Sequence, residues 1–145
     1  HQCIRIALDD RPKMTGHILS AWANPNNDFI ESGFLLQHIR KTPEKVILKD
    51  LLLDHQLVNL EPNVWHTAVV ECVGDEALFR LDDHVAYAKS DEIRPAKNLV
   101  SLTTGTVWHD VKRVRIWKAE SNPKWADLRS EILAKRRPFS AQPHQ

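Results

Sequence analysis

The chain has 145 residues, of which 42% are hydrophobic and 27% charged, so it is long enough to bury one core and too apolar to be disordered. Its 20 basic and 19 acidic side chains leave a formal net charge of +1, which excludes the strong field that draws proteins onto nucleic acid or anionic membranes. No apolar run approaches the roughly 18 residues that span a bilayer. We therefore expect one domain, no nucleic-acid partner and no membrane span.

The first half of the chain predicts four short strands. Ile4, Ile6 and Leu8 alternate with Arg5 and Ala7, and the polar residues 9–12 then form a turn. The further strands are predicted at residues 16–22, which stop at the turn 24–27, at residues 34–39 and at residues 45–49.

Two tight turns punctuate residues 64–89. Residues 65–73 predict a strand, and the turn 74–76 follows, where Gly74 can take a positive φ. A second strand is expected at residues 77–81, a second turn at Asp82, Asp83 and His84, and a third strand at residues 85–89. Residues 98–104 and 111–117 continue the pattern.

Short strands between turns rich in Asn, Asp, Gly and Pro favour an all-β, antiparallel sandwich or jelly roll over βαβ units. The predicted core residues are Val70, Cys72, Leu81, Leu102, Val114 and Ile116. Cys3 and Cys72 are either two buried thiols or one disulfide, and their spacing does not decide between these alternatives.

Only the C-terminal part predicts a helix. Asn122 can cap free amides and Pro123 suits a first turn, so we expect a helix over residues 123–136, with Trp125, Leu128 and Ile132 on the face that docks on the sandwich. The expected organisation is a β-sandwich domain at residues 1–121, a docked helix at 122–137 and a flexible tail at 138–145.

A set of motifs carries a family resemblance. They are Val64-Trp65-His66-Thr67, Glu71-Cys72-Val73-Gly74-Asp75-Glu76, Leu81-Asp82-Asp83, residues 111–117 as a closing strand, and Asn122-Pro123-Lys124-Trp125. In this order they resemble small bacterial members of the 3-keto-disaccharide hydrolase-like family of concanavalin A-like β-sandwiches. The match covers about residues 64–125, and residues 4–17 match weakly.

The resemblance implies a concanavalin A-like jelly roll in an exported, periplasmic or extracellular, bacterial protein whose relatives bind or hydrolyse sugars. Residues 24–63 match poorly, and we expect the chain to lack one or two N-terminal strands of a full sandwich. Further domains of a longer protein are a separate expectation. No cofactor is expected.

Candidate site residues follow from the chemistry that sugars need. Trp22 would stack on a pyranose, while His17, His38 and Arg80 would donate hydrogen bonds to hydroxyl groups. Glu71, a carboxylate among apolar neighbours, is the candidate catalytic acid or base. Trp65, Trp108 and Trp117 offer an alternative platform, although Trp at strand ends more often packs in a core.

Metal binding is not predicted. Asp82, Asp83 and His84 supply suitable ligand atoms, but their spacing matches no metal-binding loop and adjacent acids at a turn usually face water. The leading functional hypothesis is a carbohydrate-interacting sandwich without catalysis. The alternatives are an active hydrolase of glycosides, including 3-keto-glycosides, and a purely structural module.

Overall fold

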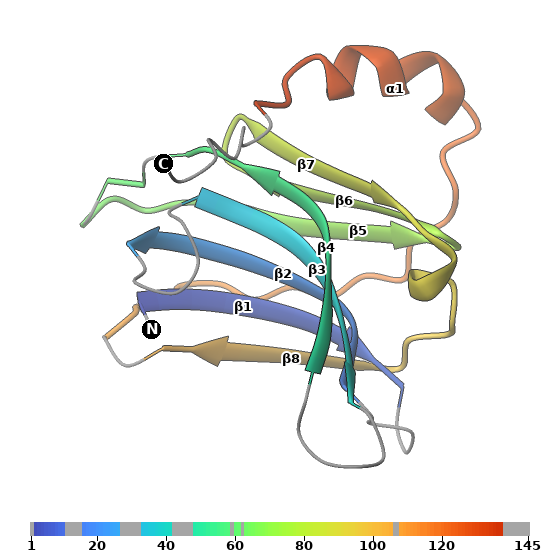
Figure 1. Cartoon of the computed structure of the whole chain (residues 1–145). Coiled ribbons are helices and arrows are strands. Elements are labelled where there is room, and N and C mark those ends of the chain that lie inside the picture. Colours follow the sequence, from blue (N-terminus) through green and yellow to red (C-terminus); the bar gives the residue numbers. More distant parts are fainter. Residues whose placement is uncertain are drawn as a thin grey trace, which may run out of the picture.

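The computed structural model describes residues 2–10, 16–26, 33–41, 48–58, 60–61, 63–105 and 108–137. In these ranges the protein is mostly β, with eight strands in two antiparallel sheets and one α-helix after the last strand (Figure 1). None of the helices in this part of the chain is long and apolar enough to cross a membrane.

The two sheets differ in size. The larger sheet has five strands in the order β4-β3-β2-β1-β8, and the smaller sheet has three in the order β5-β6-β7. The strands are β1 (Gln2–Asp9), β2 (Gly16–Asn26), β3 (Gly33–Lys41), β4 (Leu48–Gln56), β5 (Ala68–Val73), β6 (Glu76–Leu81), β7 (His84–Lys89) and β8 (Leu99–Thr104). A short 3-10 helix η1 (Asp91–Ile93) precedes β8, and the helix α1 (Trp125–Leu133) comes after β8 in the chain.

The hydrophobic core lies between the sheets. Alternating residues of β2 and β3 meet alternating residues of β6 and β7, and Phe34 and Phe79 pack edge to face with ring centroids 5.2 Å apart. The prediction for Leu81 is confirmed, since it is buried, whereas Val70 and Cys72 are only partly buried against the core. Both cysteines are free thiols, and burial raises the pKa of Cys3.

The strand predicted at residues 98–104 is confirmed as β8, but the strand predicted at 111–117 and the predicted burial of Leu102, Val114 and Ile116 are wrong. Residues 111–117 form no strand, and Leu102, Val114 and Ile116 are 43%, 64% and 71% exposed instead of buried. Alternation indicates that a segment is suited to a strand, but burial requires an opposing layer as well. The exposed fractions of Leu102, Val114 and Ile116 show that no such layer of described residues covers them.

Strand pairing also shifts several boundaries. β2 continues through residues 24–26, which were expected to turn, because Asn24 pairs with Gly33 and Asn26 pairs with Gln2. The strand predicted at residues 45–49 overlaps β4 at residues 48 and 49, and β4 continues to Gln56. Residues 45–47 of that prediction lie outside the described ranges, as does the predicted tail at 138–145. The turn at Gly74 is confirmed, with φ of 57°.

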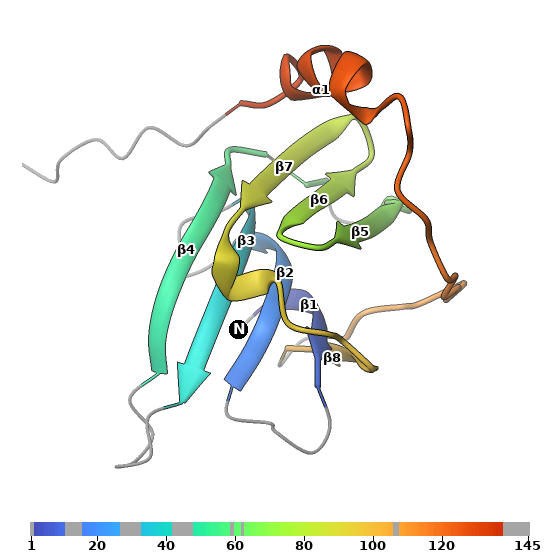
Figure 2. The same cartoon turned by 90° about the vertical axis from the view of Figure 1, so that its right-hand side faces the viewer.

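Helix α1 is shorter than the predicted helix, and on its predicted docking face Trp125 and Ile132 are half-buried while Leu128 is 37% exposed. The side chain of Asn122 accepts a hydrogen bond from the amide of Lys124, just ahead of the first helical turn. Trp125 packs near Tyr87 of β7, with ring centroids 6.3 Å apart, so the helix covers the smaller sheet from outside (Figure 2).

Candidate functional site

Trp22 lies on the outer face of the larger sheet, which is the face turned away from the core. Register places Arg5 of β1 directly opposite Trp22 of β2, and the Arg5 guanidinium lies 5.0 Å from the centroid of the indole ring. Arg5 also donates to the hydroxyl of Thr103 on β8, at 3.2 Å. A cation–π contact and a hydrogen bond therefore hold Arg5 over a half-buried Trp.

Three polar atoms on this outer face are buried and have no hydrogen-bond partner among the described residues. They are Nε of Arg5, Oγ of Ser20 and Nε1 of Trp22. Ser20 and Trp22 are two residues apart on β2, so their side chains share the face. A buried polar group without a partner costs roughly 1–3 kcal/mol, so a rearrangement that opens these atoms to the hydroxyl groups of a ligand would be favoured. We call Arg5, Ser20, Trp22 and Thr103 the Trp22 face.

His17 lies on the same outer face, at the other end of β2, and is already paired. Its Nδ1 is 2.8 Å from Oδ2 of the buried Asp9. The other carboxylate oxygen of Asp9 accepts from the amide of Ile18, inside the bulge that shifts the β2–β3 register. The pair therefore supports the bulge by satisfying a backbone amide that the sheet ladder leaves free.

His38 is on the opposite face of the larger sheet from Trp22. It follows the core residues Phe34 and Leu36 at intervals of two along β3. Its Nδ1 donates to the carbonyl of Ile18 at 2.9 Å, and its Nε2 lies 3.6 Å from a carboxylate oxygen of Glu92. His38 thus borders the end of the core beside η1.

Glu71 and Arg80 meet as an ion pair on the smaller sheet. The distance from Arg80 Nη2 to Glu71 Oε2 is 2.7 Å, and the side chains are 43% and 48% exposed, respectively. Glu71 pairs with Leu78 and therefore faces away from the core residues Ala77 and Phe79. The two sheets thus present the sequence-predicted candidates on different surfaces: Glu71 with Arg80 on one, and Trp22 with His17 on another.

The Trp-His-Thr motif locks the start of β5 to the β6–β7 turn. His66 contacts Oδ2 of Asp82 at 2.7 Å and the carbonyl of Glu61 at 3.1 Å, so the charged imidazole can donate from both nitrogens. The Asp82 hydrogen bond is the main cause that raises the pKa of His66. Desolvation pushes the pKa of Asp82 upward, but hydrogen bonds from the Thr67 amide and His66 outweigh it, so this pKa is lowered.

The Gly-Asp-Glu motif anchors the helix. Glu76 accepts from Tyr87 OH at 2.8 Å and from Trp125 Nε1 at 2.6 Å, and Arg129 of α1 lies 3.5 Å away. Desolvation pushes the pKa of Glu76 upward, yet these two hydrogen bonds and the charge of Lys89 lower it overall. The Trp-His-Thr and Gly-Asp-Glu motifs therefore have structural roles within this chain.

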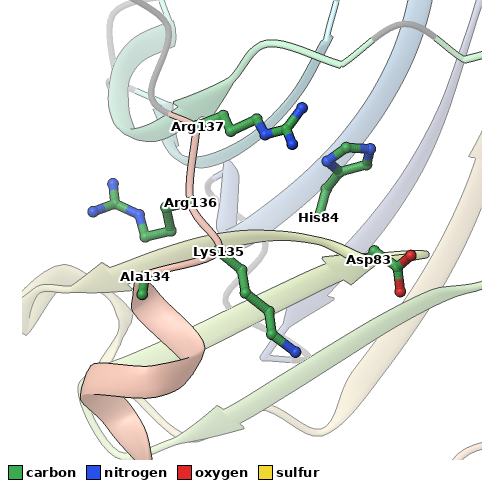
Figure 3. Close-up of a pocket in the computed structure, with 6 residues that line it drawn as sticks. All are labelled: Asp83, His84, Ala134, Lys135, Arg136 and Arg137. Carbon is green, nitrogen blue, oxygen red and sulfur yellow. The ribbon is translucent and has the colours of Figure 1, made fainter.

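A pocket of about 310 Å³ opens between the β6–β7 turn and the segment after α1. It is lined by Asp83, His84, Ala134, Lys135, Arg136 and Arg137 (Figure 3). The Arg137 side chain runs toward His84, whereas that of Arg136 turns away and binds the buried Asp54 with contacts of 3.0 and 2.6 Å. The lining is charged and has no aromatic platform, so it suits a neutral sugar less well than the Trp22 face does.

Sequence reasoning missed Arg5 and Asp54. Alternation with Ile4 and Ile6 indicates that Arg5 faces away from the core, but the contact with Trp22 depends on the β1–β2 register. Asp54 binds Arg136, which is 82 positions away in the sequence, and no local sequence pattern predicts such a contact. No family model, curated protein or solved structure matches the chain.

Proposed function

We propose that this chain is a carbohydrate-interacting domain with a concanavalin A-like jelly-roll fold, and that its ligand binds across the Trp22 face. The single observation that carries the proposal is the indole of Trp22, whose Nε1 is buried together with Arg5 Nε and Ser20 Oγ without a hydrogen-bond partner among the described residues. Sugars present apolar C–H faces and hydroxyl groups together, and an aromatic ring flanked by polar groups complements both.

Each group has a defined role in this proposal. Trp22 packs against a sugar ring, and its Nε1 and the Nε of Arg5, which are buried in the free protein, donate to hydroxyl oxygens once the surrounding side chains shift to admit the ligand. Thr103 holds the Arg5 guanidinium in place, which limits the side-chain entropy that binding costs. His17 supports the same sheet through Asp9 and lies at the far end of β2. Export to the periplasm or the extracellular space remains part of the proposal on the resemblance alone.

The test is a panel of neutral glycans and 3-keto-glycosides, scored by calorimetry for binding and by chromatography of products for turnover. Trp22→Ala should weaken binding at least about tenfold, which corresponds to about 1.4 kcal/mol. Arg5→Lys keeps the charge but loses the planar guanidinium, and should weaken binding without unfolding the sheet. Trp108→Ala is the matched control, because Trp108 is fully exposed elsewhere.

Two outcomes would contradict the proposal. One is binding that Trp22→Ala and Arg5→Lys leave unchanged, and the other is binding that Trp108→Ala weakens equally. Turnover of a 3-keto-glycoside that Glu71→Gln abolishes would instead assign hydrolysis to the exposed pair of Glu71 and Arg80. That activity needs a second carboxylate about 5–10 Å from Glu71. Absence of both binding and turnover would leave the structural module as the function.

A further inference from the structure

The smaller sheet leaves part of the larger sheet uncovered. Contacts between the sheets run from β7 to β4 and β3 and from β6 to β3, whereas β1 and β8 lie at the other side of the larger sheet. Val100 and Leu102 of β8 pair with Leu8 and Ile6, which puts all four on the core-facing side. Even so, Val100 and Leu102 are 41% and 43% exposed.

The segment after β8 is exposed in the same way. Residues 108–122 run along the outside of the molecule from β8 to α1 without forming a strand (Figures 1 and 2). Lys112 lies 5.5 Å from the ring of Trp65, which places the segment beside the chain that enters β5. Val114, Ile116 and Trp117 are each more than 60% exposed.

We call β5, β8 and residues 111–117 the open side. Three features of it define what would cover it. First, β5 pairs only with β6 among the described residues, so its other edge offers backbone donors and acceptors to an added strand. Second, the core-facing Val100 and Leu102 require apolar side chains at alternate positions of that strand.

The third feature is charge. Lys112, Arg113, Arg115 and Lys118 are all exposed, and none has an ion pair with a described residue. A second copy of the chain would bring four more cations to the same place, which is unfavourable. An occupant with acidic residues between its apolar ones would be attracted instead.

We propose that the open side binds an extended segment of a partner polypeptide that alternates apolar and acidic residues and adds to the smaller sheet beside β5. Its apolar side chains cover Val100 and Leu102, and its acidic side chains meet Arg113 and Arg115. Val100 and Leu102 lie on the opposite face of β8 from Thr103, which belongs to the Trp22 face, so the inference is independent of the proposed carbohydrate ligand.

The probe is a peptide of about nine residues that alternates Val and Glu, long enough to span the six residues of β5. Calorimetry measures its affinity, and hydrogen exchange measures protection of the β5 amides. A peptide of the same composition with Val and Glu in blocks tests the need for alternation, and one that alternates Val and Lys tests the charge. We expect only the alternating Val–Glu peptide to bind and to protect β5.

Charge reversal sharpens the test. The double variant Arg113→Glu with Arg115→Glu should bind the Val–Glu peptide at least about tenfold more weakly and should gain affinity for the Val–Lys peptide. Lys135→Glu with Arg137→Glu makes the same change in net charge at another exposed place and should leave both affinities unchanged. All four side chains are exposed, so the variants should melt as the unchanged protein does.

Several results would overturn the inference. They are binding of the block peptide as tight as that of the alternating one, no binding of any peptide, and equal effects of the two charge reversals. Sedimentation that shows a dimer, lost in Ile116→Asp, would overturn it as well, because the open side would then be occupied by a second copy.

Discussion

Replacing Arg136 with leucine removes the cation that faces a buried carboxylate between the two sheets. Asp54 is on β4, and its side chain is 5% exposed, while that of Arg136 is 28% exposed. Besides both Arg136 contacts, Asp54 accepts from the amide of Tyr87 on β7 at 2.7 Å and from Gln56 Nε2 at 2.9 Å. The carboxylate thus joins β4, β7 and the segment after α1.

The expected loss follows from what Arg136→Leu leaves behind. Removing one partner of a buried ion pair costs about 3–5 kcal/mol, because the remaining charge is buried and uncompensated. Asp54 keeps its uncharged donors and Arg136 is partly solvated, so we place the loss at about 3 kcal/mol. For a chain of this length, that lowers the melting temperature by about 6–12 °C.

A double variant separates buried charge from lost packing. Asp54→Asn removes the charge but keeps an oxygen that can accept from the Tyr87 amide, so Arg136→Leu with Asp54→Asn should be more stable than Arg136→Leu alone. Urea denaturation gives the free energies, and Arg137→Leu, with an exposed side chain, serves as control. A loss below about 1 kcal/mol, the range of exposed pairs, would refute the reasoning.

Three further predictions concern single residues. The pKa of His66 is raised in the folded protein, so its stabilising contribution is complete below the unfolded pKa of about 6.5 and is lost as the pH rises through the folded pKa. Between pH 5 and 8 the free energy of unfolding should therefore fall less in His66→Gln than in the unchanged protein. Val114→Asp should change stability by less than about 0.5 kcal/mol in thermal melts, because Val114 is 64% exposed, and a larger loss would indicate that the segment is buried. Gly33→Ala should lower the melting temperature markedly, because its Cβ would lie 2.2 Å from the carbonyl oxygen of Gln56 and Gly33 has φ of 137°. In the matched variant Gly74→Ala the added Cβ meets no atom within 4 Å, so the variant should cost only the strain of its positive φ.

The parts of the fold that sequence predicts well are those that local chemistry determines. The β5–β6 turn forms at Gly74 with φ of 57°, and the β6–β7 turn forms with Asp82 at φ of 51°, a conformation that Asp adopts more readily than most residues. Both signals lie within a few residues of the structure they specify. The alternation in β1, β3, β6 and β7 is equally local, and these strands lie where the pattern indicates.

Long-range pairing explains most of what sequence reasoning missed. Bulges shift the β2–β3 register between His17 and Ser20 and the β3–β4 register between Leu36 and Gln37, so simple alternation cannot give the facing of residues beyond them. His17 and His38 were grouped as hydrogen-bond donors to one ligand, yet they lie on opposite faces of the larger sheet. Spacing in sequence could not reveal this, because the bulge lies in a register between strands and its Ile18 amide bonds to Asp9 on a third strand.

The exposed tryptophans help to distinguish the two proposed surfaces by chemistry. Trp65 and Trp117 are 60% and 67% exposed, and at first sight they suit a sugar platform better than the half-buried Trp22 does. Their neighbours on the open side, however, are aliphatic residues and exposed cations beside an unpaired strand edge. Sugar recognition requires fixed polar groups next to the ring, and in the described part of the chain Trp22 has them, with Arg5 held over its ring. Exposed tryptophans among aliphatic residues therefore favour a polypeptide as the ligand of the open side. A tryptophan paired with fixed polar groups favours a carbohydrate as the ligand of the Trp22 face.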